Sequence, residues 1–139
     1  MKNTNSGITD LQMLIQNMEP VLNDGAYVFV TLKDADKIPR SLTIAEFKEA
    51  EGTTLVLRKE DAERLNLTYD FVAAWITLNV HSALEAVGLT AAFATELGKH
   101  HISCNVWAGY YHDHIFVDIE DGQKALEVLK AMRFKTIAL

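Results

Sequence analysis

The sequence has little of what marks secreted or membrane proteins. It holds a single cysteine, Cys104, so no disulfide can form within the chain. Its opening residues, MKNTNSGITD, contain no apolar stretch of the kind that a secretory signal needs, and no hydrophobic run reaches the length of a membrane span. We therefore expect a cytoplasmic protein with no membrane partner.

Basic residues are also scarce. Lysine and arginine number 13 against 19 aspartates and glutamates, which gives a net charge of −6. Nucleic acids bind to a clustered basic face that this balance does not supply, so we expect no nucleic-acid partner. What the chain has instead is apolar residues, at 49% of its 139 positions, enough to form a packed core without cross-links.

The first half of the chain predicts a helix, three strands and a second helix. Residues 9–18 repeat apolar side chains at helical spacing, with Thr9 and Gln12 placed as a capping box and Pro20 beyond the end. Strands are predicted in AYVFVTL and in a hairpin that joins SLTIAEFKE to TTLVL through the turn EG. A short helix, KEDAERL, follows at 59–65.

The second half predicts a regular alternation of elements. The expected order is a strand at 71–80, a helix at 88–100, strands at 102–108 and 113–119, a helix at 121–132 and a last strand in FKTIAL. This βαββαβ order is that of a ferredoxin-like unit, in which helices cover one face of an antiparallel sheet. We therefore expect an α+β protein of two such repeats, residues 1–70 and 71–139. The last strand would complete either the second repeat or the first, which otherwise lacks its opening strand.

The loop GYYH sets the pairing of the two strands on either side of it. If it forms a four-residue hairpin loop, Ala108 faces Asp113. The same register aligns Val106 with Ile115, Cys104 with Val117 and Ile102 with Ile119, all on the face against the helices. The opposite face then carries Ser103, Asn105, Trp107, His114, Phe116 and Asp118, next to Trp75 of the preceding strand. Because such aromatic side chains do not belong in open water, we predict that this face packs against a second sheet, from the first half or from another copy of the chain.

The stretch LEAVGLT leads from a strand into an apolar helix, with Gly88 in the first helical turn. The first N–H groups of a helix have no partner inside it, and the helix dipole adds partial positive charge there. Such a loop can hold a carboxylate or a phosphate on backbone donors alone, and a glycine permits close approach. The alternative is that Gly88 serves only a sharp turn.

Two longer stretches, SALEAVGLTAAFATEL and ISCNVWAGYYHDHIFV, resemble the ACT domain, a small-molecule-sensing module of βαββαβ topology. They are similar in particular to bacterial proteins built from two ACT-like repeats, as are ITDLQMLIQNMEPVLNDGAYVF and EAEGTTLVL. The resemblance implies a small ligand, an amino acid in particular, at the loop before the first helix of a repeat and against a strand of a neighbouring one.

The chain departs from the ACT pattern at two places. ACT domains often carry Asp and Pro-Gly in the ligand loop, whereas this chain has Glu85, Ala86 and Val87 before Gly88, which leaves the identity of the ligand open. Such proteins also tend to have glycine before the strand that starts ISCN, where this chain has His101. We expect a positive φ at His101, because the helix must end there and histidine tolerates this conformation better than most residues.

The predicted binding site combines this loop with its neighbours. Its residues are His81, Ser82, Glu85, Ala86, Val87, Gly88, Leu89 and Asn105. The N–H groups from Ala86 to Leu89 would hold a carboxylate, and His81 and Ser82 would contact it or cap the backbone. Glu85 would serve the site or only complement the helix dipole. Asn105 would reach the ligand across a repeat interface or stand as a polar residue on a half-exposed face.

The other chemically interesting residues point to neither a metal nor an enzyme. His112, Asp113 and His114 include metal-binding side chains, but no further ligand stands at a recognisable spacing, and we predict no metal and no cofactor. Cys104 lies in an apolar alternating segment and is expected to be a buried structural thiol. The sequence shows no nucleophile with an adjacent base, no phosphate loop and no paired carboxylates.

Two functions follow from these observations. The first is a regulatory module that binds a small molecule, an amino acid in particular, near Gly88 and responds with a change of conformation or of association between copies. The second is a structural or partner-binding protein without a ligand, which would use its aromatic sheet face as an interface. In both cases we expect a homo-oligomer.

Overall fold

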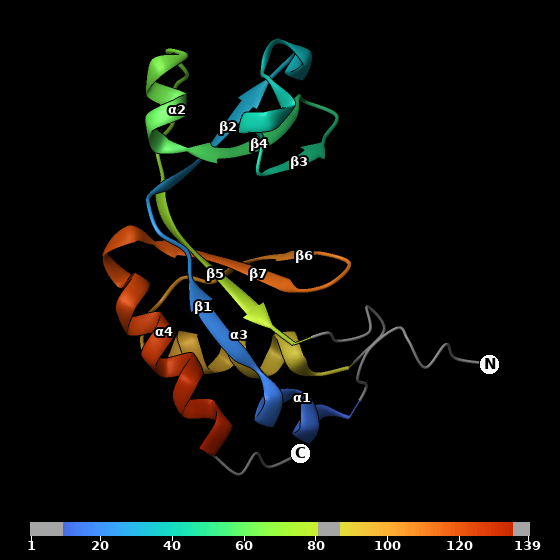
Figure 1. Cartoon of the computed structure of the whole chain (residues 1–139), viewed down its shortest axis with the longest axis vertical. Helices are drawn as coiled ribbons and strands as arrows, with labels where there is room; N and C mark the ends of the chain where they lie inside the picture. The colour runs from blue at the N-terminus through green and yellow to red at the C-terminus, as the bar shows by residue number, and fades with distance from the viewer. Residues whose placement is uncertain (1–9, 81–86, 135–139) are drawn as a thin grey trace, which may run out of the picture.

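The computed structural model describes residues 10–80 and 87–134. These form one curled antiparallel sheet of seven strands with helices on its outer side (Figure 1). The strands are β1 (Glu19–Leu22), β2 (Tyr27–Leu32), β3 (Ala45–Lys48), β4 (Thr53–Arg58), β5 (Val72–Asn79), β6 (Asn105–Ala108) and β7 (Asp113–Asp118). The α-helices are α1 (Leu11–Asn17), α2 (Lys59–Arg64), α3 (Leu89–Lys99) and α4 (Gly122–Ala131). Short 3₁₀ helices are η2 (Ala35–Lys37), η3 (Arg40–Leu42), η4 (Ile119–Asp121) and η5 (Met132–Phe134).

Two ferredoxin-like units share strand β5. Along the sheet the strand order is β3-β4-β2-β5-β7-β6. The beginning of β5 pairs with β2 at Val72 and Ala73, and so supplies the fourth strand of the first unit. All of β5 except its first residue pairs with β7 or with β1, and opens the second unit. The predicted α+β fold of two repeats is therefore confirmed, with η2 and η3 in the place of the first unit's first helix.

Strand β1 is an addition that the sequence did not predict. It pairs with the last residues of β5, and takes the position beside β5 that the fourth strand of a βαββαβ unit occupies. Strand β1 has only four residues, and one of them is Pro20, which in a sequence indicates the end of a helix. A proline is tolerated here because β1 lies at a sheet edge and needs fewer backbone donors. The residues of the predicted C-terminal strand after Phe134 lie outside the described part of the chain.

The helix ends follow local chemistry. Helix α1 begins at Leu11 and is capped by Asp10, whose carboxylate accepts a hydrogen bond from the N–H of Met13 at 3.1 Å. The cap was predicted at Thr9, which lies outside the described residues. Helix α3 ends at Lys99 with His100 as its C-cap, and the next residue, His101, has φ of 59°, the positive value that was predicted.

Helix α3 therefore closes with a Schellman motif. The N–H of Ile102 donates to the carbonyl of Leu97, and the N–H of His101 donates to that of Gly98, each at 3.0 Å. Both bonds satisfy carbonyl groups that the last helical turn would otherwise leave free. His101 thus has a structural role at the end of the helix.

The β6–β7 hairpin has the predicted register over its inner part. Ala108 pairs with Asp113 and Val106 with Ile115. Strand β6 begins at Asn105 rather than at residue 102, because the preceding residues carry the chain from the end of α3 up to the sheet. Ile102 remains buried against the helices, as its place in the apolar row predicted.

The two faces of the sheet bury different side chains. The outer face packs aliphatic residues against α1, α3 and α4 in one half and against α2 and η2 in the other. The inner face is aromatic, and its central residues are Tyr27, Val56, Ala73 and Phe116 with Phe29, Phe71, Trp75 and Trp107 around them. Phe29 of the first half lies edge-on to Phe116 of the second, with ring centroids 5.2 Å apart. The prediction that the first half of the chain covers the aromatic face is confirmed, but the covering strands belong to the same curled sheet and not to a second one.

The described α-helices have between six and eleven residues. None of them combines the length with the apolar composition that crossing a bilayer requires.

Candidate functional site

Among the described residues, no group caps the backbone donors at the N-terminus of α3. Gly88 is the N-cap residue and adopts a left-handed conformation with φ of 99° and ψ of −16°. The first helical hydrogen bond runs from the N–H of Ala92 to the carbonyl of Gly88 at 2.9 Å, so the three residues between them have no helical acceptor. Among residues 10–80 and 87–134, no side chain accepts a hydrogen bond from these three groups, and the first turn holds no acidic residue. The geometry suits an anion.

The predicted loop residues fall on both sides of the described boundary. His81, Ser82, Glu85 and Ala86 lie outside the described residues, so their predicted roles stay predictions. Val87 is 83% exposed, whereas Leu89 is buried in the aliphatic core. Leu89 could therefore contribute to a site only through its backbone.

Helix α1 limits the space beside Gly88. A Cβ atom added to Gly88 would lie 3.1 Å from Cδ2 of Leu11. Glycine thus serves two needs here, the left-handed backbone and the close approach of α1. A ligand would have to approach the free N–H groups from the side away from Leu11.

Asn105 lies away from this loop. It is the first residue of β6 and pairs with Phe116 on β7, which in turn pairs with Trp75 on β5. Trp75 precedes Asn79, the last residue of β5, by four residues, which is about 13 Å along the strand. The side chain of Asn105 donates to the carbonyl of Phe116 at 3.2 Å. Within one chain, the structure does not bring Asn105 to the amides near Gly88.

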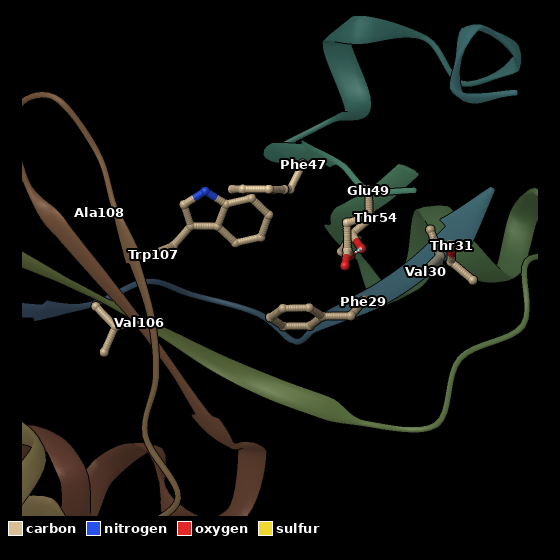
Figure 2. A pocket seen from close by; sticks show the side chains of 9 residues that line it. All are labelled: Phe29, Val30, Thr31, Phe47, Glu49, Thr54, Val106, Trp107 and Ala108. Atoms are coloured by element: carbon tan, nitrogen blue, oxygen red, sulfur yellow. Dashed lines mark hydrogen bonds between the residues drawn. The ribbon is translucent and has the colours of Figure 1, made fainter. Parts of the chain in front are cut away.

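A second candidate site is a cleft on the aromatic face. It has a volume of about 720 Å³ and lies between the open edge at β6 and the floor formed by β2, β3 and β4 (Figure 2). The rings of Phe29, Phe47 and Trp107 line it, and Glu49 and Thr54 stand at one end. A smaller cavity of about 70 Å³ adjoins Trp107 on the other side and is lined by Trp75, His114 and Phe116, among others.

His114 is tied to the aromatic cluster. Its Nδ1 atom accepts a hydrogen bond from the indole N–H of Trp75 at 3.0 Å, so in the neutral ring the proton belongs on Nε2. Burial lowers the pKa of His114, and the nearby His112 lowers it further. Both effects favour the neutral form, in which the bond to Trp75 is kept.

The described residues offer no evident metal centre or nucleophile. No group of three or more His, Cys, Asp or Glu side chains is placed to hold a metal ion in the part of the chain that the structure describes. Burial raises the pKa of Cys104 to about 11, so its thiol is protonated near neutral pH and is a poor nucleophile. Burial also raises the pKa of Asp113.

Sequence reasoning found the aromatic side chains of the second half but missed the cleft. Phe29, Thr31 and Phe47 come from strands of the first half and Glu49 follows β3; the sequence predicted these segments as strands without an assigned face. The alternation of Phe29 and Thr31 with Val28 and Val30 was a usable signal, because it sets a less aliphatic face against an aliphatic one.

Family models match both halves of the chain. Residues 6–74 match one model described as an ACT domain, and residues 71–131 match a second model with the same description. The two matches meet at the beginning of β5, the strand that both units share. No curated protein matches the chain.

Solved structures show the same fold. A protein of unknown function from Vibrio cholerae, described as a possible transport protein, is 53% identical, with 92% of this chain and 99% of that chain covered and a TM-score of 0.80. The aspartate kinase of Clostridium acetobutylicum, described as an allosteric enzyme, is 12% identical over 86% of this chain and 34% of its own, with a TM-score of 0.61. The regulatory subunit of aspartate kinase from Thermus thermophilus is 10% identical over 81% and 95%, with a TM-score of 0.58. The latter two similarities concern the fold alone. Two consecutive ACT models and a relative of this identity show that the chain belongs to the ACT domain family, a family of regulatory modules, and carries two ACT domains.

Proposed function

We propose that the protein is a regulatory module that binds a small metabolite, an amino acid in particular, at the N-terminus of α3. The ligand's carboxylate would rest on the free N–H groups that follow Gly88. The single observation that carries the proposal is this set of donors. They lie at the beginning of a helix of eleven residues, and no described side chain caps them.

The family and its neighbours support a regulatory role. ACT domains are small-molecule-sensing modules, and the Clostridium acetobutylicum neighbour is described as an allosteric enzyme. The Thermus thermophilus neighbour is described as a regulatory subunit. Binding, rather than catalysis, also agrees with the raised pKa of Cys104, which disfavours a thiolate nucleophile.

A second copy of the chain would complete the site. Asn105 and Gly88 lie near opposite ends of α3, whose eleven residues span about 16 Å, so one small ligand could touch both only if Asn105 came from another copy. The proposal therefore includes a homo-oligomer in which the ligand bridges two chains. A bridging ligand shifts association because it binds the assembled state more tightly.

The rival proposal, a ligand-free interaction protein, has less support. It was based on an aromatic face in need of a partner, and that face is packed against β2, β3 and β4 of the same chain. No described contact otherwise favours it.

The test is thermal unfolding of the full chain with a panel of the common amino acids. A ligand that binds only the folded protein raises the melting temperature by mass action, by an amount equivalent to about 2.7 kcal/mol at a hundred times its Kd. Light scattering with and without the stabilising amino acid would report any change in association. If no amino acid in the panel raises the melting temperature, the proposal is wrong.

Two glycines on α3 give a matched pair of variants. Gly88→Ala would introduce a strained backbone and a contact with Leu11, and should abolish the response to the amino acid. Gly98→Ala near the other end of the helix meets no atom within 4 Å and should keep the response. An equal response in both variants would place the ligand elsewhere.

A further inference from the structure

We propose that the aromatic cleft is a second binding site, separate from the N-terminus of α3, and that it takes an organic cation with an apolar body, such as an aromatic amine. The cleft lies on the inner face of the sheet, whereas the α3 site lies on the helix side. Its volume of about 720 Å³ falls within the range of about 300–1,000 Å³ that is usual for small-molecule sites.

The floor of the cleft is fixed by strand register. One row across the sheet runs from Thr31 on β2 through Thr54 on β4 to Phe47 on β3. The next row begins at Phe29 on the same side of β2. Because these residues pair directly across neighbouring strands, their side chains point to one face, and the polar and aromatic groups stand side by side.

Three aromatic rings form the walls. Trp107 reaches across from β6, with its ring centroid 6.1 Å from that of Phe47 and 6.4 Å from that of Phe29 (Figure 2). Phe47 is 61% exposed although it is a large apolar residue, so its ring is not fully used in packing. Rings set at an angle around an open space provide the faces that attract a cation.

A carboxylate without a counter-charge lies at one end. Glu49 accepts a hydrogen bond from the hydroxyl of Thr54. In residues 10–80 and 87–134, no lysine or arginine forms an ion pair with Glu49, whereas Glu46 on the same segment is paired with Arg40 at 3.5 Å. A ligand ammonium group would supply the missing partner for Glu49 through a charge-assisted hydrogen bond.

The open edge of β6 adds further acceptors. The N–H of Gly109 donates to the carbonyl of His112 at 2.9 Å, so by the alternation of an antiparallel ladder Trp107 also bonds to β7. The N–H and carbonyl groups of Val106 and Ala108 then both point away from β7, at the rim of the cleft. The lining of the cleft holds one carboxylate, Glu49, and no basic side chain, and this charge favours a cation over an anion.

The experiment titrates the full chain with three probes of one shape, namely phenethylamine, neutral 2-phenylethanol and anionic 3-phenylpropionate. Binding is measured by calorimetry and by amide shifts in NMR spectra. We expect saturable binding of phenethylamine, with shifts at Phe47, Glu49, Thr54 and Trp107, and affinities for the other two probes weaker by about tenfold or more.

Paired variants separate charge from shape. Glu49→Gln keeps the size of the side chain and should weaken phenethylamine binding by about tenfold, and Phe47→Ala should weaken it by about fivefold. Glu46→Gln removes the same charge from the opposite face of β3 and should leave the affinity unchanged. Equal affinity for the three probes, no saturable binding of phenethylamine, or full affinity in Glu49→Gln would each overturn the proposal.

The two proposed sites can fail independently. Gly88→Ala leaves every residue of the cleft in place, so phenethylamine should bind to this variant as it does to the unaltered protein. An amino-acid response without phenethylamine binding would support only the α3 site, and the reverse result would support only the cleft.

Discussion

The outer and inner faces of the one sheet differ in how completely their side chains fill space. On the outer face, flexible aliphatic side chains interdigitate with the helices, and Phe93, Leu97, Ile76 and Ile115 are fully buried. On the inner face, central residues such as Tyr27 and Phe116 are also buried, but the tilted rings of Phe29 and Trp107, with centroids 6.4 Å apart, line a cleft that stays open.

The difference teaches where a small fold of this kind can hold a ligand. Rigid rings prefer edge-on contacts with centroids about 4.5–7 Å apart, so they brace two halves of a sheet without filling the space between them. Aliphatic side chains adapt to their neighbours and leave few voids. A binding site is therefore expected on the aromatic face and at helix ends, and not within the aliphatic core.

The same substitution on each face should give the largest contrast. Phe93→Ala empties a fully buried position on α3 and should lower the free energy of unfolding by about 3–5 kcal/mol. Phe47→Ala removes a ring that is mostly exposed and should cost less than about 1 kcal/mol. Urea unfolding followed by circular dichroism measures both values. Equal losses would mean that the inner face is packed as tightly as the outer one.

A smaller effect should appear where α4 meets the sheet. A Cβ atom added at Gly122 would lie 2.9 Å from Cβ of Ala74, an atom held rigidly on β5. Gly122→Ala should therefore lower the free energy of unfolding by about 1–3 kcal/mol through overpacking. The exposed helical Gly98 is the control, since alanine there should raise stability by about 0.5–1 kcal/mol. A neutral result for Gly122→Ala would show that α4 can move away from the sheet without loss.

Much of this fold could be predicted from the sequence because its signals are local. The hairpin register followed from the four residues between Ala108 and Asp113, and the left-handed conformation of His101 followed from the need to end a helix. Strand β1 could not be predicted, because four residues with a proline carry no periodic signal and its pairing partner lies over fifty residues away. Strand β1 precedes the first unit in the chain but pairs with β5 beside the second unit, and this arrangement depends on tertiary contacts.

The candidate sites were predictable to different degrees. A glycine before an apolar helix indicated free donors at Gly88, since helix ends are properties of the local chain. The cleft depends on Trp107 meeting Phe47, which are sixty residues apart and share no sequence pattern. Asn105 was placed on the correct face, yet its distance from Gly88 depends on the length of α3 and on the sheet register together.

The smallest expected effect is a pH dependence that arises from His114 on the inner face. The pKa of His114 is lowered by burial and by His112, so between its folded value and the unfolded value of about 6.5 the unfolded chain binds more protons. Stability from this group is fully present above pH of about 6.5 and is lost as the pH falls below it, because a protonated Nδ1 can no longer accept from Trp75. The raised pKa of the neighbouring Asp113 makes stability depend on pH in the opposite sense. Because the pKa of Asp113 in the unfolded chain is 3.8, its contribution falls at a lower pH than that of His114. His114→Asn retains an acceptor without titrating and should flatten the pH dependence of urea unfolding near neutrality. If the free energy of unfolding of His114→Asn depended on pH as steeply as that of the unaltered protein, His114 would not be the origin of the effect.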